Sequence, residues 1–291
     1  MKGFNHSFEN GRLATSESQA IISLLEKNGK DPLYIENWRP ISILNVHYKI
    51  LSKCLAEEVK KILDKLIDIS QSGFFIGQNI LDGMRTVLDI LENTAMSNTS
   101  GLLVTIDFQK AFDSLSWDLL FTALETSNFG TDFVAWVKLC YNDISSCVIN
   151  YKISSQYFAI EKGVRQGDSL SPYLFILAVE LMSIHIRNNK EIRGIMYNES
   201  EIKILSSADD TTALLQSEND AKHLFIFLKE FEKQSGLKVN KSKTEGFWLG
   251  TNRLSNFKPL GIKWSSVIKI LGIHISYDKD EMIQRNFVDK I

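Results

Sequence analysis

Apolar side chains recur every three or four positions along several stretches of the chain, a spacing that places them on one face of an α-helix. The pattern starts near Glu17, resumes after residues 38–45 and continues over 79–96. We therefore expect roughly the first hundred residues to be mostly helical. The same spacing predicts further helices at 131–142, 171–188 and 218–235.

Strands are predicted mainly in the rest of the chain, where short runs alternate or are rich in β-branched and aromatic residues. We expect 204–207 to pair with 211–215, and 192–198 with 201–207. Other predicted strands lie at 102–107, 146–153, 155–163, 237–240, 244–250 and 268–276. Helices and strands follow each other without a regular βαβ alternation, so the predicted fold is α+β, with an antiparallel sheet packed on helices.

Composition adds that the chain is a folded globular protein, since 44% of its 291 residues are hydrophobic and 23% are charged. The three cysteines form no CxxC pair, which favours reduced intracellular thiols over a zinc site or a disulfide framework. The longest apolar run, at 173–179, is much shorter than the roughly 20 residues of a membrane span. We expect an intracellular protein, nuclear or cytoplasmic, without a membrane partner.

Charge bears on the choice of partner. The net charge of −2 counts against nucleic acid, because proteins that bind it usually carry a basic face. The charge is uneven, however, since residues 229–269 contain nine Lys or Arg against three Glu. A basic binding surface and a set of merely solvated lysines both fit this segment.

Two neighbouring aspartates, Asp209 and Asp210, stand between the apolar runs of the predicted hairpin. Aspartate is a favoured turn residue, so a plain turn is one interpretation. The other is a metal site, which needs a third carboxylate. Asp107 supplies it if the 102–107 strand lies beside the hairpin, and otherwise Asp107 caps the helix that follows.

Three carboxylates at one point repel each other and need cations to stay together. Mg²⁺ and Mn²⁺ are hard cations that prefer oxygen ligands. Two such ions about 4 Å apart can activate an attacking hydroxyl and stabilise the leaving oxygen in phosphoryl transfer. Spacing alone leaves the metal site and the turn both open.

Six sequence blocks occur in a familiar order: residues 28–45, IDFQKAFDSLSW, GVRQGDSLSPYLF, ADDTT, SGLKVNKSKTE and ILGIHIS. Together they resemble the reverse transcriptase domain of LINE-type (non-LTR) retrotransposons, over residues 18–275. The resemblance implies the right-hand polymerase fold, with fingers at about 18–100 and a palm at about 101–275. Residues 1–17 would then be a polar extension, and 276–291 would begin a thumb that is largely missing.

The resemblance also implies the activity of an RNA-directed DNA polymerase. Such an enzyme transfers dNMP from a dNTP to a primer 3′-hydroxyl on an RNA (or DNA) template. It assigns two ions, Mg²⁺ or Mn²⁺, to Asp107, Asp209, Asp210 and the backbone carbonyl of Phe108. The expected partners are an RNA template with a DNA primer, and dNTP.

Substrate-binding roles follow from the same resemblance. Phe112 resembles the steric gate that excludes a ribose 2′-hydroxyl, with a core aromatic as the alternative. Gln166 would contact the incoming nucleotide or the template, and Arg39 would clamp the triphosphate, because a guanidinium fits phosphate oxygens. Lys243 resembles a lysine that protonates the pyrophosphate, or is a surface lysine. Residues 271–275 resemble the primer grip.

The chain departs from the family pattern at three places. Ser207 stands where the family usually has Tyr or Phe before ADD, an aromatic that packs beside the primer. Ile76 and Gln78 stand where Lys and Arg are common, and Glu26 stands where Pro is often found. These departures bear on activity, because an aromatic at 207 and charges at 76 and 78 would help to hold the substrates.

Two further hypotheses therefore accompany the polymerase. One is a catalytically impaired remnant that binds nucleic acid without polymerising. The other is a metal-dependent nuclease that uses the same carboxylates, which leaves the blocks around Phe112 and Gln166 unexplained.

Overall fold

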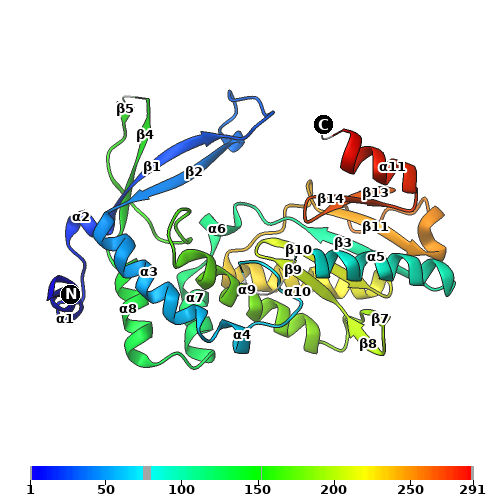
Figure 1. Cartoon of the computed structure of the whole chain (residues 1–291), viewed down its shortest axis with the longest axis horizontal. Helices are drawn as coiled ribbons and strands as arrows, with labels where there is room; N and C mark the ends of the chain where they lie inside the picture. Colours follow the sequence, from blue (N-terminus) through cyan, green and yellow to red (C-terminus); the bar gives the residue numbers. More distant parts are fainter. Residues whose placement is uncertain (1, 75–79, 152, 290–291) are drawn as a thin grey trace. The chain divides into compact units, whose positions relative to one another are not determined.

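The computed structural model describes residues 2–74, 80–151 and 153–289. By its internal contacts the chain divides into two units, each built from two stretches of sequence (Figure 1). Unit 1 comprises Met1–Leu66 and Phe112–Ala178, and unit 2 comprises Ile67–Ala111 and Val179–Ile291. The division into fingers and palm stays a prediction. Within the described ranges, no helix is long and apolar enough to cross a membrane.

Unit 1 contains a sheet with the strand order β2-β1-β4-β5, in which β6 also pairs with β4. β1 (Gln19–Glu26) pairs antiparallel with β2 (Trp38–Leu44) and parallel with β4 (Ser145–Asn150). β5 (Ile153–Ser154) and β6 (Phe158–Ala159) both pair antiparallel with β4. Both strands predicted at 146–153 and 155–163 are present, shortened to β4 and β6.

The prediction of a helix starting near Glu17 is wrong. Only the single turn α2 (Thr15–Ser18) is helical there, and β1 follows at once. The apolar run of β1 is short and contains two adjacent β-branched residues, Ile21 and Ile22, which favour a strand when other strands are available to pair with. Strands on both sides of β1 supply those partners, and the period of so short a run does not reveal them.

The remaining elements of unit 1 are helical. The predicted helices after 38–45 and at 131–142 are confirmed as α3 and α8. Two helices, α6 (Ala111–Ser114) and α9 (Ser171–Asn188), lie across the boundary between the units in the sequence. The others are α1 (Lys2–Glu9), η1 (Ile35–Asn37), α3 (Val46–Lys60), α4 (Leu63–Leu66), α7 (Trp117–Thr126) and α8 (Thr131–Tyr141).

Unit 2 is built on a five-stranded sheet with the order β12-β11-β3-β10-β9. All its neighbouring strands are antiparallel except β11 and β12, so the predicted antiparallel sheet is confirmed. Residues 237–240, predicted as a strand, form only an isolated bridge between Val239 and Phe108. The strands are β3 (Ser100–Ile106), β9 (Ile204–Ser207), β10 (Asp210–Leu215), β11 (Glu245–Gly250) and β12 (Lys263–Trp264).

Two hairpins and several short helices complete unit 2. The hairpins confirm the predicted pairing of 192–198 with 201–207 and divide the predicted strand 268–276 into two. They are β7 (Ile195–Tyr197) with β8 (Ser200–Ile202), and β13 (Val267–Ile270) with β14 (Ile273–Ser276). The short helices are η2 (Thr251–Leu254), α11 (Lys279–Ile283) and η3 (Gln284–Val288).

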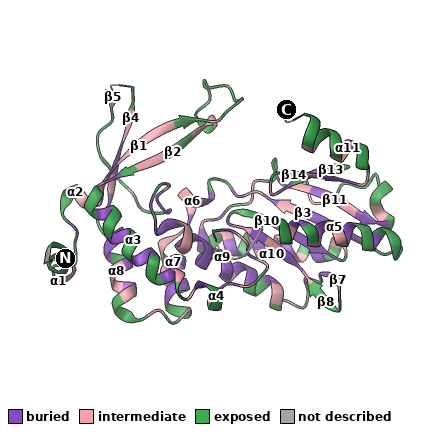
Figure 2. Cartoon of the chain, viewed as in Figure 1, coloured by how far each residue is buried: buried purple, intermediate pink, exposed green. Residues whose placement is uncertain are grey.

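Both faces of the unit 2 sheet are covered, and the core lies against its central strand β3 (Figure 2). On one face of the sheet, Leu103, Leu214 and Phe247 pack against α5 (Ile80–Met96). The alternate residues Leu102 and Val104 point to the other face and are fully buried. The long helix α10 (Glu218–Ser235) packs against β10. The helices predicted at 79–96 and 218–235 are thus confirmed.

A buried aspartate fixes the start of α10. Asp220 is 1% exposed and accepts hydrogen bonds from the backbone N–H and the guanidinium of Arg193, both at 3.0 Å. Ser217, the N-cap residue, accepts from the Asp220 N–H. Burial alone would raise the pKa of Asp220, but the bonds from Arg193 and Ser217 outweigh it and hold that pKa below its usual value.

We predict that Asp220→Asn lowers the free energy of unfolding by about 1–3 kcal/mol at neutral pH, the usual contribution of a hydrogen bond to a charged group. Because the folded-state pKa is lowered, this contribution is present above the ordinary aspartate pKa of about 3.9 and is lost as pH falls through the folded-state value. Urea unfolding at pH 7 and at progressively lower pH measures both effects. Glu230→Gln, in an exposed pair on the same helix, is the control. Equal losses in the two variants at pH 7 would contradict the prediction.

Candidate active site

The register of two adjacent strands places two of the predicted metal ligands opposite each other. β3 ends at Ile106, whose partner on β10 is Thr211, so the next positions in this register are Asp107 and Asp210. Directly opposed residues on antiparallel strands have Cα atoms about 4.5–5.5 Å apart. Their side chains point to the same face of the sheet, the face that packs on α5 further along.

Asp209 belongs to the turn that joins β9 to β10. Ser207 pairs with Asp210, which leaves Ala208 and Asp209 as a two-residue turn. The predicted hairpin across the aspartates is confirmed. Ala208 has a φ of +55°, in the left-handed region that costs a residue with a side chain about 1–2 kcal/mol. Backbone strain is therefore stored directly beside the two aspartates.

The carboxyl groups act on one another electrostatically. The pKa of Asp209 is raised, first by the partial removal of its carboxyl group from water and also by the charge of Asp107. The pKa of Asp210 is raised by the same desolvation, by Asp209 and by Asp107, while Lys269 lowers it. The charge of Asp107 acts on both Asp209 and Asp210, so the three carboxyl groups lie near one another, and a bound cation would relieve their repulsion.

The three aspartates share one end of the sheet without converging on a single point. Asp209 and Asp210 both reach solvent. In the part of the chain that the structure describes, no three His, Cys, Asp or Glu side chains are gathered closely enough to form a ready metal cluster. The three aspartate carboxylates carry like charges that repel one another. Their oxygen atoms are the donors that a hard divalent cation prefers, so the residue set fits such an ion.

Phe108, whose backbone carbonyl is the fourth predicted metal ligand, forms an isolated bridge with Val239. The bridge between Phe108 and Val239 is made by their neighbours: Gln109 N–H donates to the Lys238 carbonyl at 2.8 Å, and Asn240 N–H donates to the Asp107 carbonyl at 2.7 Å. In this antiparallel pattern, the N–H and C=O of Phe108 itself point away from the Val239 segment.

The turn that carries Lys243 makes two hydrogen bonds with the backbone of Asp107, one to its carbonyl and one from its N–H. Asn240 N–H donates to the Asp107 carbonyl, and Asp107 N–H donates to Thr244 Oγ1 at 3.3 Å. Lys243 N–H closes the turn on the Asn240 carbonyl at 3.1 Å, and its side chain is exposed. The structure therefore groups Lys243 with the aspartates in unit 2. The roles of Asn240 and Thr244 were missed in the sequence, where they are ordinary loop residues.

The predicted nucleotide-binding residues belong to unit 1, where one loop connects them. Val164 N–H donates to the Phe112 carbonyl at 2.7 Å, and Gln166 Nε2 donates to Asp113 Oδ1 at 3.1 Å. The ring of Phe112 is half-buried and stacks on Phe175, with 4.3 Å between centroids. Stacking on Phe175 fits the core aromatic, and the part of the ring that stays accessible leaves the steric gate open as a prediction. Which of them matters for function stays a prediction.

Glycine and a neighbouring strand shape this loop. Gly163 has a φ of +85°, and a Cβ there would lie within 2.8 Å of the Asp113 backbone. Only glycine combines this conformation with so close an approach. On the other side, Ser42 N–H of β2 donates to the Gln166 carbonyl at 2.8 Å. Arg39 lies three positions earlier on β2, exposed and paired in register with Leu25.

A buried polar cluster anchors the same loop and was missed in the sequence. Asp168 is 4% exposed, and its carboxylate accepts hydrogen bonds from the hydroxyls of Ser52 and Ser171. The pKa of Asp168 is raised by burial, which the two hydroxyls and Arg165 partly offset. Arg165 is also buried and donates to the Ser18 carbonyl at 2.9 Å. The Asp168 carboxylate also accepts the Ser171 N–H at 3.3 Å, at the start of α9.

The departures from the family pattern fall at different kinds of position. Ser207 lies directly opposite Asp210, and its side chain is half-buried. Glu26 is exposed at the end of β1. Ile76 and Gln78 lie outside the described residues. The missing aromatic therefore falls directly beside a predicted metal ligand, Asp210.

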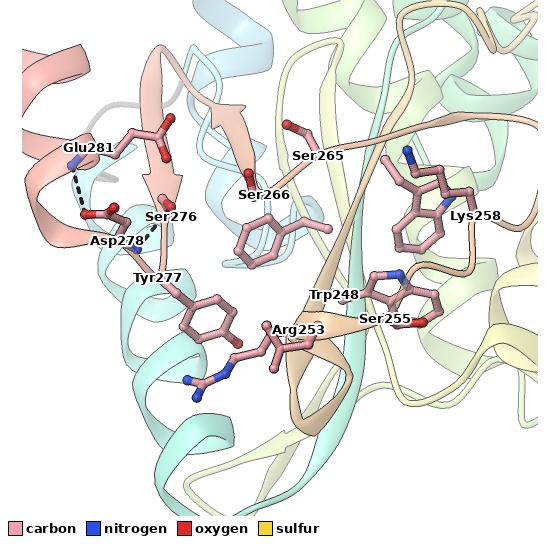
Figure 3. A pocket seen from close by; sticks show the side chains of 13 residues that line it. Trp248, Arg253, Ser255, Lys258, Ser265, Ser266, Ser276, Tyr277, Asp278 and Glu281 are labelled. Carbon is pink, nitrogen blue, oxygen red and sulfur yellow. Dashed lines mark hydrogen bonds between the residues drawn. The ribbon is translucent and has the colours of Figure 1, made fainter.

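A large open cleft of unit 2 lies away from the aspartates (Figure 3). It has a volume of about 730 Å³ and is lined by β11, by the loop after it and by the start of α11. Trp248 in its wall pairs with Leu102, five positions along β3 from Asp107, which corresponds to about 17 Å along a strand. Trp248 stacks on Trp264 at 4.3 Å, and the guanidinium of Arg253 lies 5.7 Å from the Tyr277 ring centroid.

Comparison with known proteins agrees with this geometry. Residues 25–275 match the family described as "Reverse transcriptase (RNA-dependent DNA polymerase)". The chain belongs to the reverse transcriptase family. Reverse transcriptases of this family generally use divalent metal ions, in keeping with the oxygen donors of the three aspartates.

The curated relatives are proteins of mobile elements. The chain is 30% identical, over 97% of its length, to the "Transposon TX1 uncharacterized 149 kDa protein" of Xenopus laevis. It is 26% identical, over 74% of its length, to the "RNA-directed DNA polymerase from mobile element jockey" of Drosophila funebris. It spans only 22% and 23% of these two relatives. The resemblance to LINE-type reverse transcriptases is confirmed.

Solved structures show the same fold. Telomerase from Candida tropicalis, in complex with a fragment of telomeric RNA, matches 94% of this chain with a TM-score of 0.64 at 14% identity, over 47% of that protein. Apo telomerase from the same organism, truncated from its C-terminal domain, matches 91% with a TM-score of 0.60, over 54% of that protein. The predicted α+β polymerase fold of fingers and palm is confirmed.

We predict that Asp210→Asn stabilises the protein in the presence of a chelator, because it removes one of the mutually repelling charges. The expected rise in melting temperature is small, about 1–2 °C. Since the pKa of Asp210 is raised in the folded state, the gain is largest at neutral pH. It shrinks as pH falls through that value and is gone below about 3.9.

Added Mg²⁺ should stabilise the native sequence more than Asp210→Asn, because the variant lacks one ligand. Thermal unfolding with and without Mg²⁺ measures both effects. Asp132→Asn, at an exposed position in the first turn of α8, is the control and should respond to Mg²⁺ like the native sequence. An equal response of Asp210→Asn and the native sequence would contradict a metal at these carboxylates.

Proposed function

We propose that this chain is the RNA-directed DNA polymerase domain of a retrotransposon protein, which transfers dNMP from a dNTP to a primer 3′-hydroxyl on an RNA (or DNA) template. The observation that carries the proposal is the facing position of Asp107 and Asp210, with Asp209 in the adjoining turn, in a chain of the reverse transcriptase family. The mobile-element relatives and the RNA bound in the telomerase structure support it.

In this proposal the carboxylates of Asp107, Asp209 and Asp210 and the carbonyl of Phe108 hold two Mg²⁺ (or Mn²⁺) ions. When bound, such ions lower the pKa of the attacking hydroxyl and neutralise charge on the phosphate oxygens. Phosphoryl transfer requires positioning and charge stabilisation more than covalent help. The chain's own contribution is to keep these oxygen atoms at one end of a rigid sheet.

The nucleotide-binding residues take the remaining roles. Arg39 binds the triphosphate, and Gln166 contacts the incoming nucleotide or the template. Phe112 excludes a ribose 2′-hydroxyl with a ring that its stacking on Phe175 holds in place. Lys243 protonates the pyrophosphate leaving group, a role supported by the hydrogen bonds between its turn and Asp107.

A second candidate is a remnant that binds nucleic acid without polymerising, and Ser207 favours it. A serine opposite Asp210 presents a small polar side chain where a ring would pack beside a primer. Its effect would be a weaker hold on the primer end, because base–aromatic stacking contributes about 1–3 kcal/mol.

The test is primer extension on an RNA template with Mg²⁺ and dNTP. The native chain should extend the primer, and Asp209→Ala should lower the rate by at least about 10³-fold, because charge stabilisation by bound metal is lost. Asp132→Ala, at an exposed position on α8, is the control and should retain the native rate. Primer binding without extension, unaffected by Asp209→Ala, would favour the remnant instead.

The basic segment 229–269 is proposed to meet the phosphates of the template and primer. Two of its basic residues, Arg253 and Lys258, line the cleft of Figure 3, and neither makes an ion pair among the described residues. The acidic side chains of the cleft are engaged: Asp278 accepts from the N–H groups of Asp280 and Glu281, and Glu281 pairs with Arg285 at 2.8 Å. The side chains of Arg253 and Lys258 therefore have no carboxylate partner in the described part of the chain and are available to phosphate oxygens.

We predict that the double variant Arg253→Ala/Lys258→Ala binds single-stranded RNA more weakly and with a smaller salt dependence. Each lost phosphate contact reduces the slope of log K against log salt by about 0.7, so the slope should fall by about 1.4. Fluorescence anisotropy over a range of KCl concentrations measures it. Lys138→Ala/Lys222→Ala, which removes the same charge from exposed ion pairs on α8 and α10 outside the basic segment, is the control. Equal slopes for the two double variants would contradict a phosphate-binding role for the cleft.

A further inference from the structure

The segment Ser70–Gly73 forms an extra edge beside the hairpin that carries the aspartates. Ser206 N–H donates to the Ser70 carbonyl at 2.7 Å, and Ser72 N–H donates to the Ser206 carbonyl at 2.8 Å. These bonds make a parallel bridge between Gln71 and Ser206 of β9. The segment thus runs along β9 toward the turn at Ala208.

The side chain of Gln71 reaches that turn. It is 1% exposed, and its Oε1 accepts hydrogen bonds from Ala208 N–H at 2.9 Å and from Gly73 N–H at 3.0 Å. Two N–H donors converge on this atom, which identifies it as the amide oxygen. Its Nε2 has no hydrogen-bond partner among the described residues. The contact is therefore made by one acceptor that two backbone groups share.

Gly73 allows the segment to come this close. A Cβ on Gly73 would lie 2.3 Å from the backbone nitrogen of Ala208 and 2.9 Å from the carbonyl carbon of Ser207. Real Cβ atoms essentially never approach backbone so closely, so any larger residue must displace the segment or the turn. The backbone of the segment is packed directly against the strained residue of the turn.

The other end of the segment is anchored on α9. Ser70 N–H donates to Asp68 Oδ1 at 2.9 Å, and Ser70 Oγ accepts from Arg187 at 3.2 Å. Arg187 also lies 3.8 Å from Asp68 and donates to the buried carboxylate of Glu180. This network ties the start of the Ser70–Gly73 segment to α9. It therefore limits the movement of the Gln71 side chain relative to the turn.

We propose that Gln71 is a positioning residue for the turn that carries Asp209. Its amide oxygen holds Ala208 in its left-handed conformation and so keeps Asp209 and Asp210 at the same end of the sheet as Asp107. The proposal rests on the proposed function for its catalytic consequence only, since the position of the turn can be measured without polymerisation.

The physical reason is that a two-residue turn does not hold a left-handed alanine unaided. Asp210 pairs with Ser207 at the base of the turn, but the Ala208 N–H points away from the ladder to Gln71. Without the acceptor, two buried N–H groups lose their partner and the turn is free to relax toward a less strained conformation. Ligand carboxylates a fraction of an ångström out of place bind their metal and substrate less well.

Two substitutions separate the acceptor from the shape of the side chain. Gln71→Met keeps the length and removes the acceptor, whereas Gln71→Glu keeps an acceptor at the Oε1 position. In Gln71→Glu, the second carboxyl oxygen takes the place of Nε2, which has no hydrogen-bond partner among the described residues. We expect amide hydrogen exchange in the 204–210 turn to be at least about 10-fold faster in Gln71→Met and close to native in Gln71→Glu.

Metal affinity and kinetics give the functional readouts. Mn²⁺ titration followed by electron paramagnetic resonance should show at least about 5-fold weaker binding in Gln71→Met. In primer extension, the same variant should lose about 10-fold in kcat, with the KM for dNTP within about 2-fold of native, because Arg39 and Gln166 are untouched.

Two controls exclude a general loss of stability. Thr94→Val removes a buried hydroxyl that donates within α5, and it should lower the melting temperature without changing the turn or Mn²⁺ binding. Gly73→Ala should reproduce the Gln71→Met exchange and Mn²⁺ phenotype. Gly83→Ala, in the same unit with nothing within 4 Å of its Cβ, should be native-like or more stable.

Native exchange at the turn together with native Mn²⁺ affinity in Gln71→Met would overturn the proposal. So would a loss that follows the melting temperature in the way Thr94→Val does. If the native chain does not polymerise at all, the proposed function fails, and the exchange and Mn²⁺ measurements still decide the role of Gln71.

Discussion

The pairing of β3 with β10 is the constraint on which the candidate site depends. Their register runs from Leu102 with Leu215 to Thr211 with Ile106, and nearly every residue in it is buried. A slip of one position would move each of these side chains to the opposite face of the sheet. Burial of leucine, valine and alanine along the strands therefore fixes the positions of Asp107 and Asp210 at their end.

The candidate site contains two features that destabilise it, the repulsion between its carboxylates and a strained backbone. Partial burial and the charge of Asp107 raise the pKa of both Asp209 and Asp210, and the turn between β9 and β10 contains an alanine in a strained conformation. Neither feature would persist in an isolated hairpin. The stability of the surrounding fold offsets both, through the buried sheet, the Asn240–Thr244 turn bonded to Asp107, and the Gln71 amide behind Ala208. This is the usual relation between a rigid scaffold and a functional site.

Unit 1 shows the same arrangement around its loop. Gln166 is tied by its side chain to Asp113 and by its carbonyl to β2, while Asp168 fixes the start of α9 through Ser52 and Ser171. Gln166, a residue proposed to contact substrate, is thus flanked on both sides by polar contacts that fix the loop. In both units the residues proposed to meet substrate lie in loops or strand ends, and the residues that place them are buried.

The sequence by itself determined the long amphipathic helices, the hairpin across the aspartates and the family. Helices α5, α8 and α10 and the β9–β10 pair are local features, encoded by the period of nearby apolar residues. The family was apparent because six motifs keep their order along most of the chain.

Tertiary structure alone decided which way short apolar runs folded and which buried polar groups met. The run at 19–26 became a strand because β2 and β4 lie beside it, and β4 is more than a hundred residues away. Gln71 and Ala208 are 137 residues apart, as are Asp107 and Thr244, and Ser52 and Asp168 are 116 apart. A hydrogen bond between distant residues leaves no periodic trace in the chain, because its geometry exists only once the sheet has brought both groups together.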